Sequence, residues 1–133
     1  MKIHIVKLQL KDTEDLLQFE LEKRAFFEEM VPSRGDDYYN PDNFKISLEA
    51  LLEEQIKGKS YFYLIKDTNH SIVGRINLTD IDEATKVANL GYIVGQKYTD
   101  KGITNQALSL LLQTITFAVM KYERAISWRC FIN

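Results

Sequence analysis

The chain contains few residues of the kinds that cross-link a fold or interrupt it. Its 133 residues include one cysteine, two prolines, two histidines and six glycines. A lone cysteine cannot form an internal disulfide, which suits a reducing compartment. Cys130 lies in an apolar strand pattern, so we interpret it as a packing residue.

An excess of charge of one sign is also missing. Seventeen basic and nineteen acidic residues give a formal net charge of -2 and a pI near 5.7. This mixture argues against a general nucleic-acid or membrane-surface binder. No apolar run is long enough to span a bilayer, and the opening MKIHIV is too short for the apolar part of a signal peptide. We therefore expect a cytoplasmic protein that binds neither nucleic acid nor membrane.

Two phosphate-binding motifs are absent as well. Gly58-Lys59-Ser60 lacks the glycine that a P-loop has five residues earlier, where Glu53 stands, and no three glycines have the spacing of a dinucleotide-binding fingerprint. At 45% hydrophobic residues, the chain can form a sizeable core. We expect a single domain over residues 1–133.

The most informative stretch runs from residue 90 to residue 112. Leu90, Tyr92 and Val94 fall at the spacing of one strand face, and from Gln106 dense apolar residues predict a buried helix. Between them lies the polar segment QKYTDKG. This pattern predicts a strand, a turn containing Gly102 and a helix.

The first turn of that helix is a candidate anion site. Helix N-termini present unpaired N–H groups, and the macrodipole favours negative charge there. Gly102 would let the main chain approach a phosphate, and Lys101 could add positive charge. The alternatives are a pyrophosphate site and an ordinary strand-turn-helix.

The remaining pattern predicts a mixed α/β (α+β) fold. Asp12 or Thr13 begins a helix that runs to Met30, and Ser47 begins a second helix that Gly58 ends. The expected strands and connections are an opening strand from Ile3, a hairpin of strands 60–66 and 71–77, an acidic connection over 78–86 and a last strand over 125–133.

Residues 31–44 contain both prolines and a cluster of polar and aromatic side chains. One interpretation is a tether between helices. The other is a wall of a substrate site, because binding residues concentrate on loops held by a rigid scaffold.

Three segments resemble the GNAT N-acetyltransferase superfamily, in particular its ribosomal-protein alanine and serine N-acetyltransferases. They are IVGRINLTDID at 72–82, LGYIVG at 90–95 and YTDKGITNQAL at 98–108. The family's loop pattern, Gln or Arg, two residues, Gly, one residue, then Gly or Ala, falls on Thr99 to Thr104, and these two threonines depart from it. The resemblance implies a largely antiparallel central sheet flanked by helices.

The resemblance also implies acetyl-CoA as the acyl donor and an amine as the acceptor. Backbone N–H groups around Ile93 and Val94 would hold the pantetheine and polarise the carbonyl. The pyrophosphate would lie on Lys101, Gly102, Ile103 and Thr104. Asn133 would contact the coenzyme.

For catalysis, the candidate bases follow the hairpin, and a tyrosine could protonate the leaving thiolate. The bases are Asp80, Asp82 and Glu83, with a solvated acidic turn as the alternative. The acid is Tyr92 or Tyr98, with core or rim packing as the alternative. For the acceptor we name Arg34, Tyr38 and Tyr39, and nothing in the sequence requires a metal.

Members of the family normally continue past the position of Asn133 into a helix and a strand, which this sequence lacks. A strand without its neighbour exposes unpaired backbone groups that can pair with another chain, so we expect either a homodimer that covers this edge or low stability. Two functions follow as alternatives. One is an active N-acetyltransferase, and the other is an inactive module for coenzyme binding or assembly.

Overall fold

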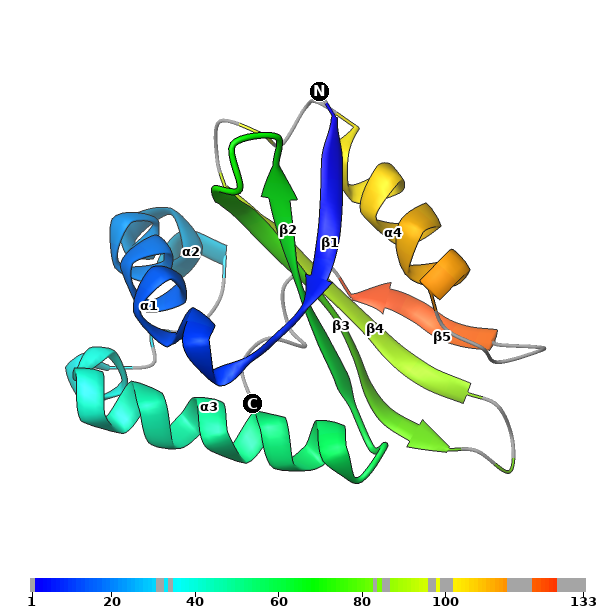
Figure 1. Ribbon diagram of the computed structural model, residues 1–133, viewed down its shortest axis with the longest axis horizontal. Coiled ribbons are helices and arrows are strands. Elements are labelled where there is room, and N and C mark those ends of the chain that lie inside the picture. The colour runs from blue at the N-terminus through cyan, green and yellow to red at the C-terminus, as the bar shows by residue number, and fades with distance from the viewer. Residues whose placement is uncertain are drawn as a thin grey trace.

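Five strands form one sheet in the order in which they occur along the chain (Figure 1). The computed structural model describes residues 2–30, 33, 35–82, 84, 87–95, 98, 102–114 and 121–126. Strands β1 to β4 are antiparallel, and β5 pairs parallel with β4. The strands are β1 Ile3–Lys7, β2 Tyr61–Asp67, β3 Ile72–Asp82, β4 Val87–Val94 and β5 Lys121–Ile126.

Helices cover both faces of this sheet. Three of them, α1, α2 and α3, lie on one side of the sheet in Figure 1, and α4 lies on the other. One core cluster packs between the sheet and α4, and a second packs between the sheet and α1 and α3. The helices are α1 Thr13–Glu22, α2 Arg24–Met30, α3 Pro41–Ile56 and α4 Ile103–Thr114, with 3-10 turns η1 Leu10–Asp12 and η2 Asp36–Tyr39.

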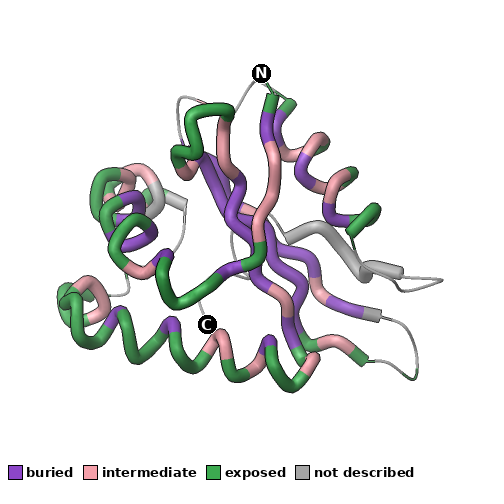
Figure 2. The backbone as a smooth tube through the Cα atoms, viewed as in Figure 1, coloured by how far each residue is buried: buried purple, intermediate pink, exposed green. Residues whose placement is uncertain are grey.

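The middle of β3 is buried without interruption from Val73 to Thr79 (Figure 2). A strand covered on both faces buries successive residues whichever way they point. Ile76 and Leu78 belong to the α4-side core, whereas the alternate residues face α1 and α3. The predicted mixed, largely antiparallel sheet with flanking helices is confirmed.

Several predicted boundaries were wrong. The second long helix begins at Pro41 and not at Ser47, because Asn40 accepts hydrogen bonds from the N–H groups of Asp42 and Asn43. Proline at the first helical position also favours that start. Strand β3 continues to Asp82, so residues 78–82 are sheet and not a connection.

The first predicted helix is interrupted. Lys23 lies between α1 and α2 and has a non-helical φ of -103° and ψ of 5°. Helix α4 begins at Ile103, three residues before the predicted start at Gln106. The last strand begins at Lys121 rather than at residue 125, and residues 127–133 of its predicted range lie outside the described residues.

Candidate functional site

Strands β4 and β5 pair along only part of β4. Their register runs from Val87 opposite Lys121 to Gly91 opposite Ile126. Among the described residues, Tyr92, Ile93 and Val94 have no partner on that side of β4. Within the described residues, the register of this strand pair therefore ends three residues before the end of β4.

The direction of the β4 amides follows from one hydrogen bond at the end of the strand. The N–H of Gly95 donates to the carbonyl of Val73 at 2.9 Å, so it faces β3. Successive amides alternate in an antiparallel strand. The N–H of Ile93 therefore also faces β3, whereas the N–H groups of Tyr92 and Val94 face the β5 side, where they pair with no residue that the structure describes.

Gly74 allows β3 and β4 to approach closely at this level. A Cβ atom at Gly74 would lie 2.5 Å from the carbonyl oxygen of Ile93. No side chain fits at that distance, and the neighbouring atom belongs to backbone that cannot rotate away. The glycine thus fixes the position of the β4 backbone beside the unpaired edge.

The turn before α4 is open at the helix N-terminus. Gly102 is exposed, has φ of +68°, and would place a Cβ atom in open space. The first helical hydrogen bond runs from Gln106 N–H to the Gly102 carbonyl at 3.2 Å. The N–H groups before Gln106 have no helical carbonyl to bind. Ile103 is buried in the core and anchors this turn, and Thr104 is half-buried.

On the opposite face of the sheet, β3 presents a buried polar row towards α1 and α3. It consists of Arg75, Asn77 and Thr79, which are 5%, 1% and 4% exposed. Arg75 donates to the Glu20 carboxylate of α1 at 2.7 Å, and both side chains are buried. The Tyr38 hydroxyl donates to the other oxygen of Glu20 at 3.0 Å. A continuous polar chain therefore joins η2, α1 and β3.

The η2 segment is fixed to the neighbouring helices. The rings of Tyr38 and Tyr39 pack edge to face at 4.9 Å, and the Arg24 guanidinium lies 4.4 Å from the centre of the Tyr39 ring. Arg24 also bonds Asp36 and Glu28, both at 2.8 Å. The hydrogen bond from Arg24 lowers the pKa of Glu28 below its ordinary value. These contacts hold two predicted acceptor residues, Tyr38 and Tyr39, in one place.

Asp80 and Tyr92, two predicted catalytic residues that the structure describes, are not brought together. Asp80 is exposed, has φ of +51°, and accepts a hydrogen bond from the Asn89 side chain at 3.1 Å. It lies four residues beyond Ile76, the partner of Tyr92, which is about 13 Å along a strand. Asp80 is thus a solvated carboxylate within β3, and not in a turn. Tyr92 is half-buried and packs against both core clusters.

The other two described catalytic candidates, Tyr98 and Asp82, make ordinary structural contacts. Tyr98 is half-buried against the α4-side core, in keeping with rim packing. The exposed Asp82 bonds the N–H of Ala84 at 3.0 Å, which is ordinary turn chemistry. Four predicted site residues lie outside the described residues. These are Arg34, Glu83, Lys101 and Asn133.

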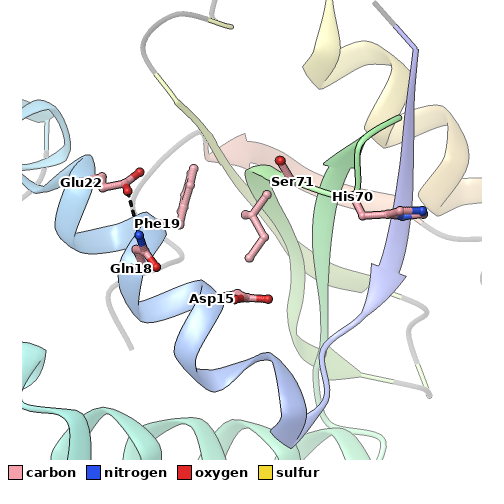
Figure 3. A pocket seen from close by; sticks show the side chains of 7 residues that line it. Asp15, Gln18, Phe19, Glu22, His70 and Ser71 are labelled. Carbon is pink, nitrogen blue, oxygen red and sulfur yellow. Dashed lines mark hydrogen bonds between the residues drawn. The ribbon is translucent and has the colours of Figure 1, made fainter.

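A groove of about 300 Å³ separates α1 from the β2–β3 turn (Figure 3). Its α1 side carries Gln18, which donates to Glu22 at 3.2 Å, and its other side carries His70. The ring of His70 also packs edge to face with His4 at 5.4 Å. Because the polar groups here are exposed to solvent, we assign no ligand to this groove.

The sequence interpretation missed Glu20, Arg75 and Asn77. A signal was present, since Arg75 and Asn77 occupy alternate positions of the otherwise apolar segment IVGRINL. Polar residues at period two indicate one polar face of a strand. The sequence did not indicate that this face would be covered by helices.

The comparison with known protein families decides the assignment. Residues 2–132 match the family described as the acetyltransferase (GNAT) domain. The chain belongs to the GNAT acetyltransferase family. The resemblance inferred from the three sequence segments is thereby confirmed.

Relatives within the GNAT family give the same assignment. A probable N-acetyltransferase, YjcK of Bacillus subtilis, is 28% identical over 124 residues, which is 92% of this chain and 68% of that protein. The ribosomal protein uS5-alanine N-acetyltransferase of Escherichia coli is 24% identical over 77% of this chain and 54% of its own length. The chain thus spans only part of these relatives.

Solved GNAT structures share the fold. Ribosomal-protein-S5-alanine acetyltransferase of Vibrio fischeri superposes with a TM-score of 0.76 at 19% identity, covering 85% of this chain and 63% of that one. The microcin C7 self-immunity acetyltransferase MccE, solved with acetyl-CoA and AMP, has a TM-score of 0.69 at 25% identity, covering 84% and 61%.

No helix among the described residues has both the length and the apolar character needed to cross a membrane. Nor do three or more histidine, cysteine, aspartate or glutamate side chains gather there as metal ligands.

Proposed function

We propose that this GNAT chain transfers an acetyl group from acetyl-CoA to a primary amine, within one acyltransferase domain over residues 1–133. The observation that carries the proposal is the end of β4, where Tyr92 and Val94 direct N–H groups away from β3 and pair with no described residue, followed by the open N-terminus of α4. The end of β4 supplies main-chain hydrogen-bond donors for an extended chain, and the start of α4 supplies donors for a diphosphate. Acetyl-CoA contains both parts, and its thioester supplies the acetyl group.

The protein's own groups suit these roles. Tyr92 and Val94 offer N–H groups on the edge of β4, and the Ile93 backbone supports them from the β3 side. Lys101, with the segment 102–104, would bind the diphosphate at the start of α4. The open space around Gly102 supports this assignment, because a phosphate can approach the backbone there. Asn133 stays a predicted contact to the coenzyme.

Direct transfer requires the amine nitrogen to form a bond to the thioester carbonyl carbon while the carbon–sulfur bond breaks. The nitrogen loses a proton and the sulfur gains one. Tyr92 is the predicted donor to sulfur, since its strand lies at the unpaired edge. Asp80 and Glu83 remain the predicted bases, acting through water, although the exposed position of Asp80 gives that role little support.

The acceptor would approach the sheet from the face that α1, α2 and η2 cover. Tyr38 and Tyr39 are held there by defined contacts, and Arg34 precedes them in the chain. The names of two relatives describe alanine N-acetylation of a ribosomal protein. We therefore propose a protein N-terminal amine as the acceptor class, and a cytoplasmic location in which ribosomal proteins are available.

Isothermal titration with acetyl-CoA tests the donor half of this proposal. The Gly102→Val variant should lose most of the binding heat, because the side chain and the strained backbone would both disturb the anion site. Gly58→Val is the matched control, since Gly58 has a similar φ of +72° but follows α3. Equal loss in both variants would point to misfolding and not to the site.

Turnover with an amine panel tests the acceptor half. The panel contains peptides that begin with alanine or serine and a small alkylamine, and product is detected by mass spectrometry. Binding of acetyl-CoA without product from any amine would favour the inactive binding module. Light scattering on the same sample tests the predicted homodimer, which a stable, monodisperse monomer would contradict.

A further inference from the structure

The Asn77 side chain contains a buried polar atom that the fold does not satisfy. Asn77 is 1% exposed, and its Oδ1 atom has no hydrogen-bond partner among the residues that the structure describes. More than nine in ten buried polar groups in folded proteins are paired. An unpaired acceptor in the interior costs stability, so its retention calls for a functional reason.

The location of Asn77 suggests that reason. In the sheet register it lies between Phe62 of β2 and Gly91 of β4. Gly91 has no side chain, so this β4 position places no side-chain donor opposite the Asn77 amide. Gly91 is also the last β4 residue that pairs with β5 in the described part of the chain. Asn77 therefore lies level with the last β4–β5 pair of the described residues, one residue before Tyr92.

Asn77 faces the acceptor side of the sheet. It shares a strand face with Arg75, whose guanidinium binds Glu20 of α1, and Glu20 in turn accepts from Tyr38. Helix α4, at whose start we place the diphosphate, covers the opposite face (Figure 1). A donor bound at the β4 edge thus leaves the α1 face for the second substrate.

We propose that Asn77 Oδ1 accepts a hydrogen bond from an N–H of the acceptor amine and holds its nitrogen beside the thioester. This inference rests on the proposed function and names a substrate-binding residue for it. An amide oxygen can only accept, so it binds an N–H and leaves the nitrogen lone pair to point elsewhere. A neutral amide also stabilises ammonium less than a carboxylate would, which suits a nucleophile that must be uncharged.

The proposal predicts a chemical preference. Primary amines have N–H groups to donate once neutral, whereas an N,N-dimethylated amine has none. A peptide with a free N-terminus should therefore bind at Asn77, and its N,N-dimethyl form should not.

The kinetic test compares Asn77→Leu with the unmodified protein. Leucine is similar in size and removes the acceptor, so kcat/KM for the amine should fall about tenfold while KM for acetyl-CoA changes less than twofold. Asn77→Ala is the second variant in case leucine does not fit. Thr79→Val, a change on the same face of β3, is the matched control and should stay within twofold. An unchanged kcat/KM in both Asn77 variants, or an equal fall in the control, would overturn the proposal.

A second readout does not depend on turnover. The Asn77 side-chain amide signals of ¹⁵N-labelled protein are followed by NMR during titration with each peptide of the panel and with its N,N-dimethyl form, at a pH at which both terminal amines are neutral. A shift with the free peptide alone supports the proposal, and no shift or equal shifts overturn it. Failure of the unmodified protein to bind acetyl-CoA would refute the proposed function, but this titration needs no acetyl-CoA and still decides the role of Asn77.

Discussion

Removal of Glu20 should be among the most damaging single changes outside the apolar core. The carboxylate lies 2.7 Å from the Arg75 guanidinium, and the two side chains are 8% and 6% exposed. Loss of one member of a buried ion pair leaves the other charge in a poorly solvating interior, at a cost of about 3–5 kcal/mol. Domains of this kind have an unfolding free energy of about 5–15 kcal/mol, so Glu20→Leu should remove a large share of it.

The assay is urea denaturation at neutral pH, followed by circular dichroism. With an m-value of about 2 kcal/mol/M, the midpoint should fall by about 2 M in Glu20→Leu and in Arg75→Met. The double variant should be far more stable than the sum of the two losses predicts, because apolar side chains of similar volume can replace a buried pair at little cost.

The exposed pair of Lys57 and Glu53 provides the control. These side chains are 56% and 68% exposed and 3.7 Å apart. Glu53→Gln should therefore change the unfolding free energy by no more than about 1 kcal/mol. Additive losses in the Glu20 and Arg75 cycle, or single losses no larger than that of the control, would refute the assignment of a buried, coupled pair.

Three further changes test the site and its support. Gly74→Ala should lower the free energy of unfolding by about 1–3 kcal/mol, because the new Cβ would lie 2.5 Å from the Ile93 carbonyl oxygen. The same variant should bind acetyl-CoA more weakly in the calorimeter. Unchanged binding would show that the β4 edge tolerates displacement. Tyr38→Phe should raise KM for the amine several-fold, since Glu20 loses a hydrogen bond, and should leave KM for acetyl-CoA unchanged. Equal effects on both constants would argue against an acceptor role for Tyr38. Burial raises the pKa of Tyr63 above 10.0. The unfolded chain therefore loses this proton first, so stability should decline above about pH 10 by urea denaturation, and less steeply in Tyr63→Phe; identical slopes would contradict the assignment.

Several features of this protein follow from local sequence. The aromatic and branched residues of β2, the period-two spacing of β4 and the dense apolar residues of α4 specify elements that are wholly or partly buried, and the glycine before α4 marks the turn. Three short segments were enough to indicate the GNAT family, and they lie on the consecutive strands β3 and β4 and at the start of α4. The prediction failed where local signals competed. Asn40 and Pro41 made a stronger helix start than Ser47, and β3 continued through an acidic segment that reads as a turn.

The acceptor side was decided only by the tertiary structure. Glu20 and Arg75 are 55 residues apart, and nothing in either segment indicates that α1 would be laid across β3 to pair them. The register between β3 and β4 is also a long-range property, and it sets Asn77 beside Gly91. Periodicity reports which residues share a face, because it depends on neighbours along the chain. What covers that face, and which polar atom stays unpaired there, depends on how distant segments pack.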